Sequence, residues 1–132
     1  MAAEDVEALR AVYAKWEVGD FDTPEIFADD AEATWAQEVP DAVPARGIEA
    51  IGASMLNFLA AWDDYRWQAD EFIPAGDRVV VFITARGRGK GSTVEVEAHW
   101  AHIWTFRDGK ATRLEGYTDR AEALAVSGVG GK

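Results

Sequence analysis

The sequence predicts an α+β domain in which three helices of the N-terminal half cover the concave face of a curled antiparallel sheet. Apolar residues recur at helical spacing in the first half of the chain, whereas after residue 65 they follow strand patterns separated by turn signals. The length of 132 residues suits one domain with its own core, at roughly 100–200 residues per domain. We therefore expect a single domain over residues 1–132, with an ordered core at 4–126 and a flexible tail at 127–132.

Two helices are predicted before the first strand. Residues 4–18 place apolar side chains at helical spacing, and Gly19 follows where a left-handed C-cap residue would lie. Thr23 suits an N-cap and Pro24 suits the first helical turn, so a short second helix is expected up to residues 29–30.

A strand, a loop and a third helix follow. Alternation of apolar and polar residues at 31–35 predicts a strand with one buried face, on which Trp35 points inward. Residues 37–47 contain two prolines, and a loop of this length in a small domain often covers a functional opening, so we interpret it as a lid. An apolar helical stripe at 48–62 is closed by the acidic pair at 63–64.

The remainder of the chain alternates between strands and turns. The connecting sequences PAGD, GRGKG and DG are strong turn signals, so the strands are expected to pair as an antiparallel meander. Asp119 and Glu122 have capping-box spacing, which predicts a short terminal helix. The predicted strands are residues 65–73, 78–88, 93–107 and 110–118, and the terminal helix is 120–126.

Composition excludes several classes of function. The chain has 24 acidic and 13 basic side chains, and its formal net charge of −11 repels nucleic-acid backbones and anionic lipid headgroups. It has no cysteine, no apolar run long enough for a membrane span, and no charged-then-apolar run before the first helix. We therefore expect a cytoplasmic protein with neither nucleic acid nor membrane as a partner.

Four segments carry a family resemblance: YAKWEVGDFD at 13–22, FADDA at 27–31, AGDRVVV at 75–81 and HIWTFRDGK at 102–110. They resemble the SnoaL-like branch of the nuclear transport factor 2-like superfamily, which also holds the ketosteroid isomerases. The resemblance implies a cone-shaped sheet around the helices, a mostly apolar pocket at the open end and a homodimer through the outer sheet face. Because the superfamily includes isomerases, cyclases, dehydratases, epoxide hydrolases and noncatalytic scaffolds, the fold leaves the function open.

His102 is the first candidate for chemistry. It lies among indoles on the apolar face of the strand at 93–107, where burial lowers the pKa of an imidazole and keeps it neutral. The alternative is a core histidine that is hydrogen-bonded to a neighbour. The resemblance places His102 near the protonated aspartic acid of the ketosteroid isomerase oxyanion hole. His99 is three residues away and thus on the opposite face, so the two histidines cannot share a metal and no metal site is expected.

Tyr13 is the second candidate, because it lies on the inward stripe of the first helix, where ketosteroid isomerases also carry a tyrosine. Core packing is the alternative for this residue. By the same resemblance, Trp35 occupies the place of the isomerases' aspartate base, and an indole cannot abstract a proton. Gly116 stands where SnoaL-type cyclases offer an aspartate. Two of the aspartates that the superfamily uses for acid–base catalysis are therefore absent from this sequence.

These observations lead to two hypotheses. The first is an enzyme that needs no cofactor and acts on a small hydrophobic cyclic molecule, as an isomerase, cyclase or dehydratase, by proton transfer at His102 assisted by Tyr13. The second is a noncatalytic module that binds an apolar ligand or serves as a dimeric interaction domain. An open cavity of about 300 Å³ or more with His102 in its wall favours the first, and side chains that fill the cone favour the second.

Aromatic and aliphatic side chains are expected to wall the pocket. The six tryptophans are about four times the average usage for this length, and such side chains either fill a core or line a binding site. A homodimer is expected through an uncharged strip on the outer sheet face, formed by His99, Ala101, Ile103 and Thr105 next to Tyr117. The expected substrate-binding residues are Trp16, Trp35, Met55, Leu59, Trp62, Phe82, Trp100, Trp104 and Leu114.

Overall fold

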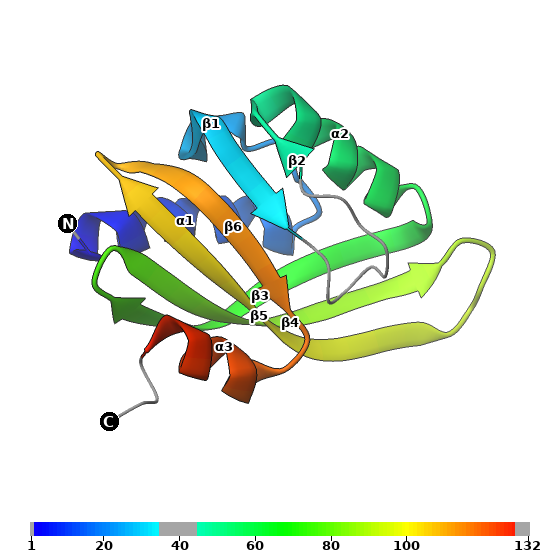
Figure 1. The fold of residues 1–132 in the computed structure, drawn as a ribbon. Coiled ribbons are helices and arrows are strands. Elements are labelled where there is room, and N and C mark those ends of the chain that lie inside the picture. The colour runs from blue at the N-terminus through cyan, green and yellow to red at the C-terminus, as the bar shows by residue number, and fades with distance from the viewer. Residues whose placement is uncertain (1, 35–44, 129–132) are drawn as a thin grey trace.

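The structure, a computed structural model, describes residues 2–34 and 45–128. Within these residues, six strands form one curved sheet in the order β2-β1-β6-β5-β4-β3, and helices pack on both of its faces (Figure 1). The predicted α+β class is confirmed. The elements are α1 (Ala2–Glu17), the 3₁₀ helix η1 (Pro24–Ile26), β1 (Phe27–Thr34), β2 (Ala45–Arg46), α2 (Ile48–Leu59), β3 (Trp62–Ala75), β4 (Arg78–Gly89), β5 (Glu95–Arg107), β6 (Lys110–Tyr117) and α3 (Arg120–Ser127).

The sheet is mixed, whereas the sequence predicts only antiparallel pairing. Strands β3 to β6 form the expected meander, but β1 pairs in parallel with β6, for example Ala33 with Leu114. Alternation in β1 identifies a buried face but carries no information about the direction of its neighbour. The parallel pair places the C-terminal end of β1 beside β6, the strand that follows β5 in the chain.

The concave face is covered by α1 and α2, as Figure 1 shows. Leu9, Tyr13 and Trp16 are spaced three and four residues apart on α1, and all are buried against the sheet. Trp67 of β3 and Trp104 of β5 complete the centre of this core, which is therefore largely aromatic.

The convex face is partly covered by α3, a position that the sequence did not indicate. Ala123 of this helix packs with Val80, Ala101 and Ile103 in a second apolar cluster. Asp119 caps α3 as predicted, because its carboxylate accepts from the backbone N–H groups of residues 121 and 122. The predicted outer strip is therefore wrong at Ala101 and Ile103, which are covered by the chain's own helix.

Two helix boundaries also differ from their predictions. The short second helix, expected up to residues 29–30, ends at Ile26, and β1 begins at Phe27. The apolar stripe at 48–62 continues to Trp62, yet α2 ends at Leu59 and Trp62 begins β3. The neighbouring strand has room for Trp62 in its position on β3: a Cβ atom on Gly87 would lie 2.6 Å from Tyr65 Cδ1 and 3.0 Å from Trp62 Cε3. The absence of a side chain at this glycine lets the two rings pack on β4.

Two expectations lie partly or wholly outside the described residues. Trp35 and most of the proposed lid at 37–47 belong to residues 35–44, of which nothing is described. The last part of that loop contains β2, a two-residue strand that pairs with β1 through Ala33 and Ala45 and was not predicted.

Candidate functional site

Tyr13 and His102 meet in the concave interior. The Tyr13 hydroxyl oxygen lies 2.7 Å from His102 Nδ1, although the two residues are 89 positions apart. Trp104 Nε1 donates to the same hydroxyl oxygen at 2.9 Å. Helix α1 supplies the phenol, and β5 supplies the histidine and the indole from one face. The structure thus brings together both residues that the sequence singles out for chemistry.

Aromatic rings enclose this pair. The His102 ring centroid lies 4.7 Å from that of Trp67 and 6.3 Å from that of Trp16, both in edge-on arrangements. Tyr13 packs edge-on against Trp16 at 4.9 Å. His102 has no exposed surface and Tyr13 is only 2% exposed, so the pair is held within a dry apolar environment.

Burial controls the protonation of His102. Desolvation lowers the pKa of the imidazole from 6.5 to about 3, because burial removes the hydration of the charged ring. At neutral pH the ring is therefore uncharged, with one nitrogen that donates and one that accepts a hydrogen bond.

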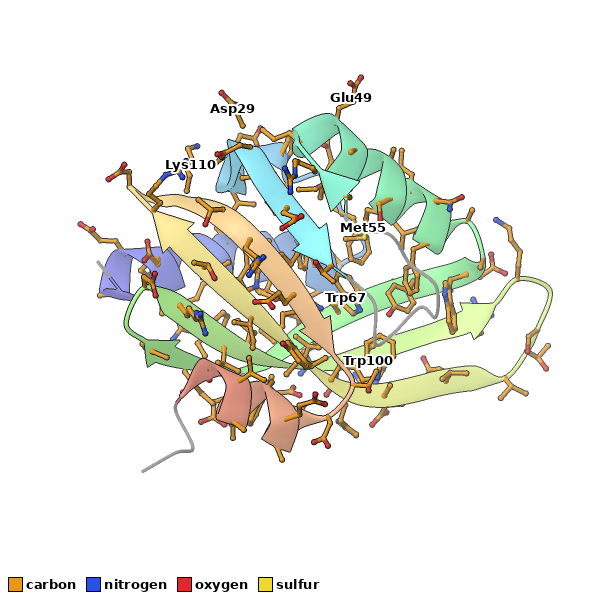
Figure 2. The ribbon with its side chains drawn as sticks, in the orientation of Figure 1. Asp29, Glu49, Met55, Trp67, Trp100 and Lys110 are labelled. Carbon is orange, nitrogen blue, oxygen red and sulfur yellow. The ribbon has the colours of Figure 1, made fainter. Side chains whose placement is uncertain are left out.

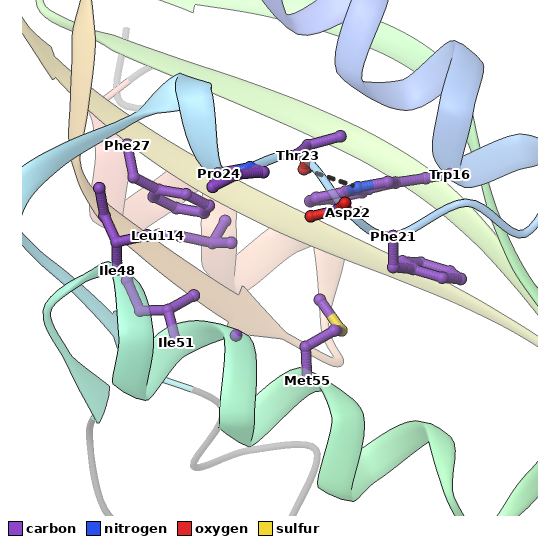
Figure 3. Close-up of a pocket in the computed structure, with 11 residues that line it drawn as sticks. Trp16, Phe21, Asp22, Thr23, Pro24, Phe27, Ile48, Ile51, Met55 and Leu114 are labelled. Atoms are coloured by element: carbon purple, nitrogen blue, oxygen red, sulfur yellow. Dashed lines mark hydrogen bonds between the residues drawn. The ribbon is translucent and has the colours of Figure 1, made fainter.

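An apolar cavity of about 70 Å³ lies beside the pair, between α2 and the sheet (Figure 3). Trp16 forms one wall, and its Nε1 donates to Thr23 Oγ1 at 3.1 Å. Thr23 thus anchors this indole, although its position predicted only an N-cap, and η1 has no side-chain cap. The lining residues are Trp16, Phe21, Asp22, Thr23, Pro24, Phe27, Ile48, Ile51, Gly52, Met55 and Leu114.

Trp16 connects the cavity with the buried pair. It lines the cavity, and it also contacts the rings of Tyr13 and His102. Neither Tyr13 nor His102 lines the cavity itself. A ligand in the cavity would therefore contact the indole before it reached the phenol or the imidazole.

The other expected pocket residues fall into distinct environments. Met55 and Leu114 line the cavity together with Trp16. Leu59, Trp62 and Trp100 are half-buried against the main core, and Figure 2 marks Met55, Trp67 and Trp100.

Phe82 is a correction. It packs in the convex cluster, with the Arg120 guanidinium 4.7 Å from its ring centroid, and so cannot line the concave pocket. The apolar run at 79–83 explains the error, because strand positions with apolar side chains on both faces give no alternation to read.

The sequence interpretation missed two other aromatic residues. Trp67 contacts His102, and Phe27 lines the cavity while its ring lies 5.7 Å from that of Trp104. Trp67 alternates with polar neighbours in β3, which is a usable signal for the buried face. Phe27 falls within the short helix that the sequence predicts, so the strand pattern gives no face for it.

His99 is exposed, with Nε2 3.2 Å from a Glu97 carboxylate oxygen, and lies on the face opposite His102. In residues 2–34 and 45–128, no three His, Asp or Glu side chains are grouped so that they could hold a metal ion. Across the same part of the chain, no helix is long and apolar enough to cross a membrane.

A curved sheet whose concave face is covered by helices is also the fold of solved structures described as nuclear transport factor 2-like. Within this class, the family model of the SnoaL-like domain matches residues 2–114. The chain belongs to this SnoaL-like family, as the four sequence segments predicted. No curated protein matches the sequence.

Solved structures share the fold. A hypothetical protein from Catenulispora acidiphila with a ketosteroid isomerase-like fold, in complex with trimethylamine, is 21% identical, with a TM-score of 0.74 and 93% of each chain covered. TerC, co-crystallized with polyporic acid, is 26% identical, with a TM-score of 0.72 and 95% of this chain and 98% of that chain covered. A putative SnoaL-like polyketide cyclase from Jannaschia sp. CCS1 is 17% identical, with a TM-score of 0.77 and coverage of 96% and 93%.

Proposed function

We propose that this protein is a cofactor-independent enzyme that acts on a small hydrophobic cyclic molecule by acid–base chemistry at Tyr13 and His102. Isomerisation, cyclisation and dehydration are the reaction classes that fit. The observation that carries the proposal is the 2.7 Å contact between the phenol oxygen and the imidazole nitrogen, inside an aromatic interior. Two proton-bearing groups from α1 and β5 are thereby joined behind the Trp16 indole, which forms one wall of the cavity.

The adjoining cavity supports a hydrophobic ligand. Its wall is mostly apolar and includes Phe27, Ile51, Met55 and Leu114, with Asp22 as the one charged residue among the described lining residues. TerC, at 26% identity, was co-crystallized with polyporic acid, which supports small-molecule binding by a chain of this kind. The ligand is expected to displace the Trp16 indole or pack against it.

The proposal is tested by ligand screening followed by turnover. A panel of ring ketones, epoxides and cyclic alcohols is scanned for a rise in the thermal midpoint, since binding to the native state alone stabilises it. With any compound that is converted, His102→Gln and Tyr13→Phe should each lower kcat by about 100-fold or more. His99→Gln, on the opposite face of β5, is the matched control and should leave kcat unchanged. Full turnover by the His102 variant would refute the catalytic role of His102.

Noncatalytic binding of an apolar ligand is the second candidate, and the lining of the cavity favours it. Neither Tyr13 nor His102 contributes to that lining, so a ligand held there contacts neither group. The cavity of about 70 Å³ is far below the about 300 Å³ or more of a typical ligand site, so either function requires a side chain such as the Trp16 indole to move. NMR separates the two functions. A ligand that shifts the Met55 methyl signal but not the His102 ring signals supports binding without chemistry, and shifts of both support the enzyme.

We also propose that the chain forms a homodimer through the part of the convex face that α3 leaves open. His99 and Thr105 of the predicted strip remain at least partly exposed. Light scattering at tens of micromolar protein should give the mass of a dimer. A monomer mass under these conditions would contradict the proposal.

A further inference from the structure

Two consecutive hydrogen bonds join three side chains in the concave interior. Trp104 Nε1 lies 2.9 Å from the Tyr13 hydroxyl oxygen, and this oxygen lies 2.7 Å from His102 Nδ1. All three residues are at most 2% exposed. Trp104 and His102 are two positions apart on one face of β5, so the strand itself sets the spacing of the two groups that reach the phenol.

The chemistry of the three groups gives these bonds a direction. An indole N–H only donates, so the Tyr13 oxygen accepts from Trp104 and its own hydrogen points away from the indole. We assign the phenol hydrogen to the second bond, in which His102 Nδ1, 2.7 Å from the oxygen, accepts. A neutral imidazole carries one proton, and with Nδ1 as the acceptor that proton is on Nε2.

We infer that Trp104 is a positioning residue that acts through Tyr13 to hold His102 in its Nε2–H tautomer, so that the pair gives a proton to a bound oxygen rather than taking one. This inference rests on the proposed function, because it assigns a direction to the proton transfer at the same site. It narrows the ligand class to cyclic molecules with a carbonyl or leaving-group oxygen on which negative charge develops.

The proton that reaches the ligand oxygen is supplied by these side chains alone. As negative charge develops on the ligand oxygen, the His102 Nε2–H bond breaks and an O–H bond forms on the ligand. The Tyr13 O–H bond breaks at the same time, and its proton forms a bond to Nδ1. The electron pair stays on the Tyr13 oxygen, where the Trp104 N–H donates to the resulting phenolate. The imidazole remains neutral throughout, which suits a site where burial opposes its charged form.

The tautomer is measured without any ligand. In protein labelled with ¹⁵N-histidine, couplings from the ring hydrogens identify which nitrogen of His102 carries the proton. The expected result is the Nε2–H form, and a predominant Nδ1–H form would overturn the inference. Because no substrate is involved, this failure is distinguishable from failure of the proposed enzyme, which turnover measures.

Trp104→Phe tests the positioning role, because it keeps an aromatic ring and removes the N–H donor. Loss of one hydrogen bond should lower the ratio of the Nε2–H to the Nδ1–H form by about five- to tenfold. Trp67→Phe is the matched control: Trp67 is equally buried and contacts the His102 ring, but its Nε1 donates to the Tyr65 hydroxyl at 2.8 Å. This control should leave the tautomer ratio unchanged.

Equal ratios in the Trp104→Phe and Trp67→Phe variants would overturn the positioning role. Tyr13→Phe provides a second route if the tryptophan variant does not fold. It removes the donor to Nδ1, and the Nε2–H preference of His102 should fall. An unchanged tautomer ratio in this variant would likewise contradict the inference.

Discussion

The two faces of the sheet accommodate polar side chains in different ways. On the concave face, the fully buried His102 is paired with the neutral Tyr13, among aromatic rings. On the convex face, Arg120 and Asp70 form an ion pair at 2.9 Å while each side chain remains 30% exposed. The same strand β5 contributes to both faces, since His102 and His99 point in opposite directions.

The two faces therefore depend on different polar interactions for their stability. Neutral hydrogen bonds in a dry interior are insensitive to salt, but a buried titratable ring makes the concave face sensitive to acid. Partly exposed ion pairs on the convex face are screened by water and salt, so each contributes little. We therefore expect large effects of substitutions on the concave face and smaller, salt-dependent effects on the convex face.

The largest effect is expected from Trp16→Ala. This indole is 1% exposed and packs against several rings, so its removal should lower the free energy of unfolding by about 3–5 kcal/mol. Phe82→Ala removes a partly exposed ring from the convex cluster and should cost about half as much. Urea unfolding monitored by circular dichroism measures both. Equal losses would mean that the two faces do not differ in packing.

The second-largest effect on stability is expected from acid, which should destabilise the concave face. Burial lowers the pKa of His102 from 6.5 to about 3, so between these values the unfolded state binds a proton that the folded state does not. The contribution of His102 to the free energy of unfolding is therefore fully present above pH 6.5. It falls as the pH is lowered, and the loss reaches about 3 kcal/mol near pH 4.

Urea unfolding of the wild type and of His102→Gln, each at pH 7 and pH 4, isolates this contribution. The variant should lose less stability between the two pH values than the wild type. An NMR titration that gives His102 a pKa above 7 would contradict the prediction, since it would require a charged partner in the interior.

Arg120→Met should have an intermediate effect, confined to α3. The guanidinium donates to Asp70, to the backbone oxygen of Ile83 at 2.8 Å and to that of Trp100 at 3.2 Å. Its loss should cost about 1–3 kcal/mol and remove hydrogen-exchange protection from α3 amides. Protection of the α1 amides should persist. Loss of protection in both helices would show that the two faces are not independent.

The smallest effect is expected from Arg86→Met on the open part of the convex face. Arg86 pairs with Glu97 at 3.2 Å, and both side chains are more than 40% exposed. The expected loss is at most about 1 kcal/mol, and it should disappear in high salt. A larger, salt-independent loss would show that this ion pair is not exposed to solvent.

Where polar and apolar residues alternate along a strand, the sequence predicted which side chains point into the core. The inward direction of His102 and the outward direction of His99 follow from their positions in one strand. The pattern failed at Phe82, where both faces of β4 are apolar, and at Trp62, whose spacing also continues the stripe of α2. In both places the neighbouring element decides: α3 covers Phe82, and Gly87 accommodates Trp62.

The sequence by itself determined the family, the order of the main elements and the two residues of the candidate site, because these depend on local spacing and on recognisable segments. Only the tertiary structure decided that Tyr13 reaches Nδ1 of His102 across 89 positions and that Trp104 donates to the same oxygen. Such contacts depend on how α1 crosses the sheet. That crossing is set by packing of the entire aromatic core, which no local pattern encodes.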